Sequence, residues 1–335
     1  MTDDEPTRVA IACQGGGSHT AFTAGVLKGL FRKWDRDEYE LVGISGTSGG
    51  AFSALMAWYG LVSEDEERAI ELLDSLWSDL AADDFGDWIA NSWMVGLKWM
   101  ENSVFPLPQL SPYQNPSSGL GKRGIRRVLE RYVDFDEIPE LCGHDTPELV
   151  IGTVNLNAGV FETFTNEDVT AKAILASAAL PQMFEAVEID GDNYWDGVFS
   201  HNPPVEGLMN VSVDRKPEEL WVIQINPQER DVNPTSLNDI LDRRNELFGN
   251  ISLNQELRTV KRVNEWIERG DLSTENFTHT EIRKIPLGES YHAATKFDRS
   301  KPFIDDLFEL GEQRAAEFLE DPEPESPVPR ADGGK

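Results

Sequence analysis

The chain has 335 residues, of which 60 are acidic and 30 are basic, so its formal net charge at pH 7 is −30. A surface this acidic repels phosphate backbones, which excludes nucleic acid as an expected partner. No apolar run reaches the roughly 18 residues that suggest a membrane-spanning helix. Two cysteines, Cys13 and Cys142, do not indicate a disulfide framework. The acidic, polar N-terminal residues do not resemble a secretory signal, so we expect a cytoplasmic protein.

The excess of negative charge also predicts a preference for salt. Repulsion among like charges opposes a compact fold at low ionic strength. In about 1 M salt the Debye length falls to about 3 Å, and this repulsion is largely screened. Only 11 of the 30 basic residues are lysines. We therefore favour a salt-rich cytoplasm over an ordinary acidic protein as the setting of this chain.

Short apolar runs alternate with segments of helical periodicity along the chain. The runs predict strands at residues 8–13, 41–44, 147–154, 160–164, 220–226 and 280–285. The periodic segments predict helices at residues 18–34, 49–61, 64–80, 170–179, 236–269 and 303–319. This alternation predicts an α/β fold, a three-layer α/β/α sandwich around a mostly parallel central sheet.

The motifs described below are unevenly distributed along the chain. All of them fall within residues 8–213, which we expect to form one domain. Residues 214–320 carry no motif and are expected to pack onto the same domain. Residues 321–335 are rich in Pro, Glu and Asp, which predicts a disordered tail.

Residues 85–116 are rich in large apolar side chains, including Trp93 and Trp99. One interpretation is a lid or acyl-chain wall that touches a lipid or granule surface. The other is an apolar cap on the core, and the usual burial of large aromatic side chains favours it slightly. Exposure of Trp93 and Trp99 would favour the lid.

The most informative segment is residues 40–54. An apolar run there leads into Gly46-x-Ser48-x-Gly50, and a helix-like segment follows. This pattern between a strand and a helix is typical of a nucleophile elbow, in which Gly46 and Gly50 permit a sharp turn that holds the serine hydroxyl outward. A second serine, Ser45, lacks the closing glycine of the pattern. The segment therefore predicts Ser48 as a nucleophile.

Three successive glycines, Gly15, Gly16 and Gly17, lie between a predicted strand and a helix N-terminus. Their backbone N–H groups can converge on one point, and the helix dipole adds positive potential there. An oxyanion that forms during acyl transfer needs such a site, although many other anions also bind glycine-rich turns. The segment matches neither a Walker loop nor a dinucleotide fingerprint, because the required Gly-Lys-Ser/Thr end and last glycine are absent.

A serine nucleophile needs a base, and Asp196 is the first candidate. Asp196 and Gly197 form an Asp-Gly turn before an Asn-Pro-Pro stop, which alone indicates an ordinary turn. Aspartate is a weak base with a pKa of about 3.9 in model peptides. It could serve if it were partly desolvated and hydrogen-bonded to Ser48. A Ser-His-Asp triad with His201 or His292 stays open, since both follow Asp196 in the chain.

Together these segments resemble the patatin-like phospholipase family. That family combines an Asp-Gly-Gly-Gly-x-Arg/Lys-Gly oxyanion loop, a Gly-x-Ser-x-Gly elbow, an Ala-Ser-x-Ala-x-Pro segment and an Asp-Gly-Gly/Ala motif. The matching segments here are residues 14–20, 46–50, 176–181 and 196–198, so the resemblance covers about residues 8–210. It implies a Ser48–Asp196 dyad without histidine, an acyl-enzyme, and an oxyanion held by Gly15, Gly16 and Gly17.

The chain departs from the family pattern at four positions. Gln14 replaces the usual acid, His19 replaces Arg or Lys, Thr20 replaces the final glycine and Val198 replaces Gly or Ala. A histidine with a pKa of about 6.5 is mostly neutral at pH 7, so a fixed cation is missing at that position. We therefore expect uncharged esters to be preferred over anionic phospholipid.

Three functions stay open at this point. The first is a serine acyl hydrolase acting on lipid esters through the dyad or a histidine triad. The second is an intracellular polyhydroxyalkanoate depolymerase, since related patatin-like proteins of salt-loving archaea are similar to such enzymes. The third is a non-catalytic lipid- or granule-binding protein. We expect a lipid or polyester partner, at a membrane or granule surface, with no cofactor and no metal; the oligomeric state stays open.

Overall fold

The computed structural model describes residues 5–81, 111–114, 116–181, 183–230, 233–288, 291 and 293–320, and side chains at 116–120, 237, 238, 242, 293 and 294 are not described. Most of the tryptophan-rich segment and the predicted tail at 321–335 lie outside this part of the chain. No described helix combines the length and apolar character needed to cross a membrane.

The structure is built on one sheet with the strand order β5-β6-β3-β2-β1-β7-β8, in which β4 also pairs with β3. The strands are β1 (Thr7–Cys13), β2 (Tyr39–Gly46), β3 (Glu148–Asn155), β4 (Val160–Thr165), β5 (Val187–Ile189), β6 (Asp192–Asp196), β7 (Glu219–Gln224) and β8 (Glu281–Pro286). The five strands β3, β2, β1, β7 and β8 are parallel, whereas β4, β5 and β6 join through antiparallel pairs.

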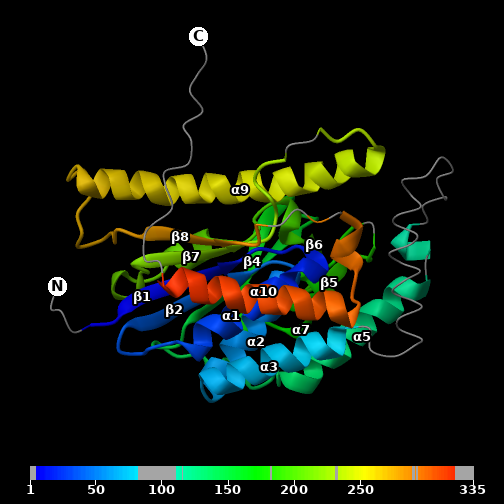
Figure 1. Cartoon of the computed structure of the whole chain (residues 1–335), viewed down its shortest axis with the longest axis horizontal. Coiled ribbons are helices and arrows are strands. Elements are labelled where there is room, and N and C mark those ends of the chain that lie inside the picture. The colour runs from blue at the N-terminus through cyan, green and yellow to red at the C-terminus, as the bar shows by residue number, and fades with distance from the viewer. Residues whose placement is uncertain are drawn as a thin grey trace, which may run out of the picture.

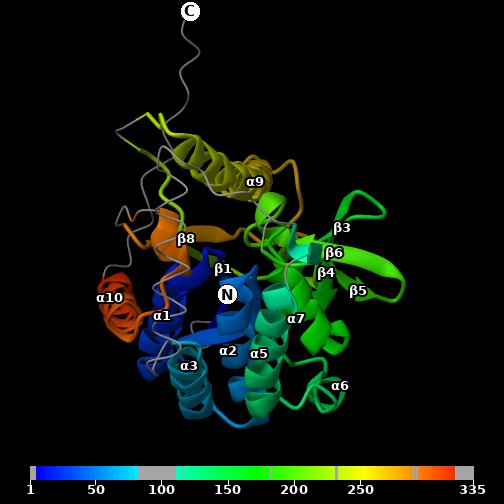
Figure 2. The same ribbon diagram turned by 90° about the vertical axis from the view of Figure 1, so that its right-hand side faces the viewer.

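Helices cover both faces of this sheet (Figures 1 and 2). They are α1 (Ala21–Arg32), α2 (Gly49–Ser63), α3 (Glu66–Leu80), α5 (Pro116–Tyr132), α6 (Ile138–Leu141), α7 (Ala171–Ser177), α8 (Glu206–Met209), α9 (Leu237–Glu268) and α10 (Lys301–Glu320). Figure 1 shows α9 along one face, with α1, α2, α3 and α10 on the other. The predicted α/β fold with a mostly parallel central sheet is confirmed.

The alternation of side chains along β1 explains the two cores. Val9, Ile11 and Cys13 point into the larger apolar cluster, on the side of α1, α2 and α3. Ala10 and Ala12 point to the opposite face and pack with side chains of α9. Successive residues of a strand face opposite sides of a sheet, so an apolar strand such as β1 is buried on both faces.

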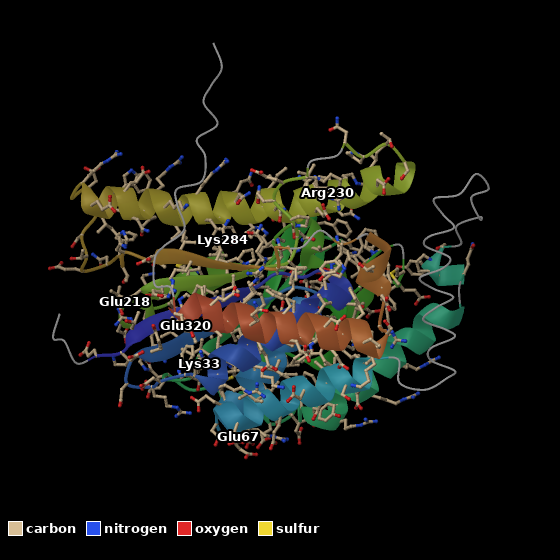
Figure 3. The ribbon with its side chains drawn as sticks, viewed as in Figure 1. Lys33, Glu67, Glu218, Arg230, Lys284 and Glu320 are labelled. Carbon is tan, nitrogen blue, oxygen red and sulfur yellow. The ribbon has the colours of Figure 1, made fainter. Side chains whose placement is uncertain are left out.

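Helices α1 and α10, the first and last α-helices of the described chain, lie side by side (Figure 1). A side chain on Gly25 of α1 would collide with the backbone of α10 at Phe308, and one on Gly311 would collide with α1 at Phe22. The helices therefore touch backbone to backbone. Figure 3 labels Lys33 and Glu320, whose 3.8 Å ion pair joins the ends of the two helices.

The structure differs from the expected elements in three places. The helix predicted at 18–34 is a 3₁₀ turn (Gly17–Thr20) followed by α1. The sequence pattern missed α5, and it also missed the β5–β6 hairpin, whose short strands have no long apolar run. β7, β8, α9 and α10, all in residues 214–320, share the sheet and layers of the earlier residues.

Candidate active site

The strand–turn–helix at Ser48 has the strained backbone of an elbow. β2 ends at Gly46, α2 begins at Gly49, and Ser48 between them has φ 56° and ψ −128°. A positive φ is uncommon for a residue with a side chain and marks strain that the surrounding structure must hold. Ser48 is 7% exposed, so the residue is largely enclosed.

The two predicted glycines of the elbow have a steric role. A side chain on Gly46 would collide with the backbone of Gly50, and one on Gly50 would collide with the carbonyl oxygen of Cys13 at the end of β1. The turn is thus compressed against the neighbouring strand. Only glycine permits this approach, which accounts for the residue type at both positions.

The sheet brings Asp196 to the same place as Ser48. β2 pairs parallel with β3, where Gly46 is opposite Ile151. β6 pairs antiparallel with β3, where Asp196 is opposite Thr153. β4 occupies the other edge of β3 over residues 150–155, so β2 and β6 share one edge and run toward each other. Their ends meet there, which places the last residue of β6 beside the elbow.

Asp196 is fully buried at this meeting point. Its Oδ1 accepts a 2.9 Å hydrogen bond from the Val198 N–H, while Oδ2 has no hydrogen-bond partner among the described residues. Burial raises the pKa of this carboxyl to about 7, although the Val198 N–H and the Ser48 side chain both lower it. The Ser48 side chain is thus close enough to lower the pKa of Asp196, although the two side chains do not form a hydrogen bond of normal geometry. A pKa near 7 makes this aspartate a far better base than an exposed one.

The glycine loop lies against the elbow, and one of its N–H groups is already used. The Gly15 N–H donates to Asn202 Oδ1 at 2.6 Å. Within the described chain, the Gly16 and Gly17 N–H groups donate to no acceptor. A side chain on Gly49 would lie 2.9 Å from the Gly17 carbonyl oxygen. The loop and the start of α2 are therefore neighbours, with the N–H groups of Gly16 and Gly17 free for a ligand.

Ser177 is a site residue whose role the sequence pattern did not reveal. It lies at the end of α7, in the Ala-Ser-x-Ala-x-Pro segment. Its Oγ accepts a 3.0 Å hydrogen bond from the Ser48 N–H and donates a 2.7 Å bond to the Gly152 carbonyl oxygen. Ser177 thereby ties the strained elbow to β3. The motif indicated that the segment mattered, but only the fold shows what this hydroxyl contacts.

The side chains of the described histidines contact other residues than Ser48 and Asp196. The ring centroids of His201 and Phe161 are 3.7 Å apart, and His201 Nε2 is 3.8 Å from Glu256 Oε1. His292 lies outside the described residues. Within the described chain, neither Ser48 nor Asp196 forms a hydrogen bond with a histidine.

His19 is a buried, neutral residue. It is 3% exposed, and its Nε2 lies 2.7 Å from Thr295 Oγ1. Burial, with a smaller effect of nearby Lys296, lowers the pKa of His19 to about 3. This position therefore supplies no positive charge at pH 7. Lys296, which the sequence pattern did not single out, is the nearby cation, and it lies 3.5 Å from buried Glu246.

The family model of the patatin-like phospholipases matches residues 11–209, more than half of the chain. The chain belongs to this family. Membership in the patatin-like phospholipases supports a lipid acyl hydrolase activity. The matched region contains the elbow, the glycine loop and Asp196, and it ends before β7, β8, α9 and α10.

Two solved structures resemble the chain at low identity. VipD from Legionella pneumophila is 14% identical with a TM-score of 0.42, over 94% of this chain and 67% of that one. ExoU, in its complex with SpcU from the type III secretion system of Pseudomonas aeruginosa, is 13% identical with a TM-score of 0.35. That match covers 95% of this chain but only 52% of ExoU. No curated protein gives a significant match. Both scores lie below 0.5, so we base no argument on them.

Proposed function

We propose that this patatin-like protein hydrolyses acyl esters of lipids with Ser48 as nucleophile and Asp196 as general base. The observation that carries the proposal is the meeting of β2 and β6 on one edge of β3, which sets a strained serine beside a fully buried carboxylate. The pKa of that carboxyl, raised by burial to about 7, suits a base that works near neutral pH.

The reaction proceeds in two halves. Asp196 accepts the hydroxyl proton of Ser48 as Oγ attacks the ester carbonyl carbon, and the carbonyl oxygen becomes an oxyanion. The oxyanion collapses, the bond to the leaving alkoxide breaks, and the proton passes from Asp196 to the leaving oxygen. An acyl-serine remains. Water then attacks the acyl carbon as Asp196 accepts its proton. The bond to Ser48 Oγ breaks, Asp196 returns the proton to Oγ, and the carboxylic acid leaves.

The oxyanion is held by backbone N–H groups at the glycine loop. Gly16 and Gly17 supply the free donors, and Gly15 positions them, because its own N–H is bonded to Asn202. The Gly49 N–H, directly after the nucleophile, is a further candidate that the sequence pattern did not suggest. In serine hydrolases with this type of elbow, the N–H of the residue after the nucleophile commonly contributes.

We further propose that the substrate is an uncharged ester, either an acylglycerol or a storage polyester. His19 is neutral, Lys296 lies beside Glu246, and the chain carries a formal net charge of −30. An anionic lipid surface would therefore be repelled at low salt. Since such substrates are insoluble, the reaction would take place on a lipid or granule surface in contact with the cytoplasm.

The test is a substrate panel in molar KCl: short and long nitrophenyl esters, neutral and anionic phospholipid vesicles, and amorphous polyester granules. We expect hydrolysis of neutral esters that Ser48→Ala and Asp196→Asn abolish. Ser45→Ala is the matched control, because Ser45 is also buried and lies three residues earlier on β2. Loss of activity in that control alone would move the nucleophile to Ser45. Absence of any Ser48-dependent hydrolysis would leave the non-catalytic binding protein as the better function.

The same panel separates the dyad from a triad. We expect His201→Gln to retain activity within about threefold, since its ring lies against Phe161 and Glu256. His292→Gln is measured beside it. A loss of about 100-fold or more in either variant, with the fold intact, would favour a histidine base.

A further inference from the structure

We infer that helix α9, which lies beyond the residues matched by the family model, helps to hold the active site in its catalytic geometry. It acts through a buried network of three side-chain amides: Gln14, Asn202 and Asn250. In this assignment, Gln14 and Asn250 are positioning residues that hold the glycine loop in place for the oxyanion. The inference rests on the proposed function, because the loop is assigned there as the oxyanion site.

Asn202 grips the first glycine of the loop at two points. Its Oδ1 accepts from the Gly15 N–H at 2.6 Å, and its Nδ2 donates to the Gly15 carbonyl oxygen at 3.2 Å. Two hydrogen bonds from one side-chain amide to the backbone of one residue fix both its position and its orientation. The direction of the Gly16 and Gly17 N–H groups, which follow directly, is thereby set.

Gln14, the residue before the glycines, connects this grip to α9. It is fully buried, and its Nε2 donates to the Asn202 carbonyl oxygen at 3.2 Å and to Asn250 Oδ1 at 3.1 Å. Its Oε1 accepts from the N–H groups of Ile225 and Asn226, at 2.9 and 2.8 Å. Both donors and both acceptor sites of the amide are used. Gln14 is therefore a fully satisfied junction between β1, the loop after β7, the Asn202 segment and α9.

The residue type at position 14 fits this junction. The family pattern has an acid there, and an ionised carboxylate could accept from Ile225 and Asn226. It could not donate, so the oxygen atoms of Asn202 and Asn250 would each lose a partner. A buried acceptor left without a donor is costly. The glutamine and Asn250 thus form a matched pair, which accounts for one of the departures from the family pattern.

α9 meets the site at close range. Asn250 is 1% exposed, and its Nδ2 donates to the Pro227 carbonyl oxygen at 3.0 Å. A side chain on the preceding Gly249 would lie 3.1 Å from Asn202 Nδ2. One turn earlier, Glu246 pairs with Arg230 at 2.6 Å, and Figure 3 shows Arg230 beside this part of α9. The inner face of the helix is thus bonded to the segment that follows β7 and packs against Asn202.

The same helix contains a matched control. Asn264 makes an equivalent two-point grip on Thr280: its Nδ2 donates to the carbonyl oxygen at 2.7 Å and its Oδ1 accepts from the N–H at 3.0 Å. That grip lies at the start of β8, at the opposite end of the parallel strands from the elbow. Loss of Asn264 should therefore cost stability without disturbing the oxyanion loop.

The experiment compares Asn250→Leu, Asn250→Asp and Asn264→Leu in the full chain, with a nitrophenyl ester. We expect Asn250→Leu to lower kcat about 10-fold or more with KM within about threefold, since removal of an oxyanion donor costs about 10²–10³. Asn250→Asp keeps an oxygen that accepts from Gln14 but loses the donor to the Pro227 carbonyl oxygen, so it should recover only part of the lost kcat. Asn264→Leu should lower the thermal midpoint and leave kcat per folded molecule unchanged. If Asn250→Leu does not fold, Asn250→Ala takes its place.

A pre-steady-state burst of nitrophenol separates positioning from general destabilisation. The same N–H groups hold the oxyanion during acylation and deacylation, so both steps should slow together in Asn250→Leu. A kcat for Asn250→Leu equal to that of Asn264→Leu would overturn the inference, as would equal kcat values for Asn250→Asp and Asn250→Leu. If the wild-type protein itself shows no Ser48-dependent turnover, the proposed function fails instead.

Discussion

The contact between α1 and α10, called the seam below, and the loops around Ser48 are both rich in glycine. The glycines have different roles in the two regions. In the seam, Gly25 and Gly311 have ordinary helical backbones and simply let two helices touch. At the site, glycines flank a serine with positive φ, Gly17 itself has φ 62°, and Asp196 Oδ2 has no hydrogen-bond partner among the described residues. Close packing stabilises the first region, whereas the second stores strain that the rest of the fold must hold.

The largest effect should come from Ser48→Gly. We expect kcat to fall by at least about 10⁴-fold, because the nucleophile is removed. We also expect the free energy of unfolding to rise by about 1 kcal/mol, since glycine adopts this backbone conformation without strain. Ester hydrolysis and chemical denaturation measure the two. A loss of stability would show that the site is not strained in the way the comparison requires.

Asp196→Asn should nearly abolish activity as well, by about 10³-fold or more. In the wild type, kcat/KM should rise with pH around a midpoint near 7, the pKa that burial gives Asp196. The base must be ionised to work, so activity is lost as the pH falls below that value. A profile that stays flat from pH 5 to 9 would remove Asp196 from the role of base.

The same variant has a predicted effect on stability. The folded-state pKa of Asp196 lies above the unfolded value, so the contribution of Asp196 to stability is lost as the pH rises from about 4 to about 7. Asp196→Asn carries no charge to bury. It should match the wild type below pH 4 and exceed it above pH 7, by up to about 4 kcal/mol. Urea unfolding at pH 4 and pH 8 provides the check.

Gly25→Ala tests the other region. The new methyl group would meet the backbone of Phe308, which cannot move aside without displacing α10. We expect a loss of about 3 kcal/mol in the free energy of unfolding, the upper end of the usual cost of overpacking, because the obstacle is backbone. The kcat of the folded fraction should stay within about twofold of the wild type. A lower kcat at equal stability would show that the seam and the site are coupled.

Salt should stabilise the whole protein by a smaller amount. With a net charge of −30, screening relieves more repulsion than attraction. The thermal midpoint should rise by several degrees from about 0.1 M to molar KCl, and a midpoint that does not change would contradict the predicted preference for salt.

The smallest effect should be that of Glu312→Gln. Glu312 of α10 pairs with both Lys28 and Arg32 of α1 across the seam. Removing these partly exposed pairs should cost at most about 1 kcal/mol at low salt, and less in molar KCl. Thermal unfolding in both salts measures this, and a loss that grows with salt would contradict it.

Most of the fold could be predicted because the central parallel strands β1, β2, β3 and β7 contain buried apolar runs. The runs that predicted β1, β2, β3 and β7 coincide with observed strands to within a few residues. β5 and β6 were not predicted because they are short and polar, and because β6 pairs with β3, which is far away in the chain. α5 follows the tryptophan-rich segment and contains three glycines, which weaken its helical pattern.

At the site, sequence and resemblance could indicate which residues matter, but not how each is held. The roles of Ser48 and Asp196 stay proposals, although the structure places the two together. The grip of Asn202 on Gly15 and the bond of Gln14 to Asn250 join residues about 190 and 240 positions apart. No local pattern encodes such pairs, because they exist only once the sheet has formed.

The connection of Gln14 to Asn250 has a consequence for synthesis of the chain. A nascent chain that has emerged as far as β6 contains both Ser48 and Asp196, yet it lacks Asn226, Asn250 and the Lys296 backbone that lies against Gly17. Domains generally form from the N-terminal end while translation continues. We therefore expect the growing chain to be unable to cleave esters until α9 and the segment before α10 have emerged, so the ribosome releases an active enzyme only when nearly all of it exists.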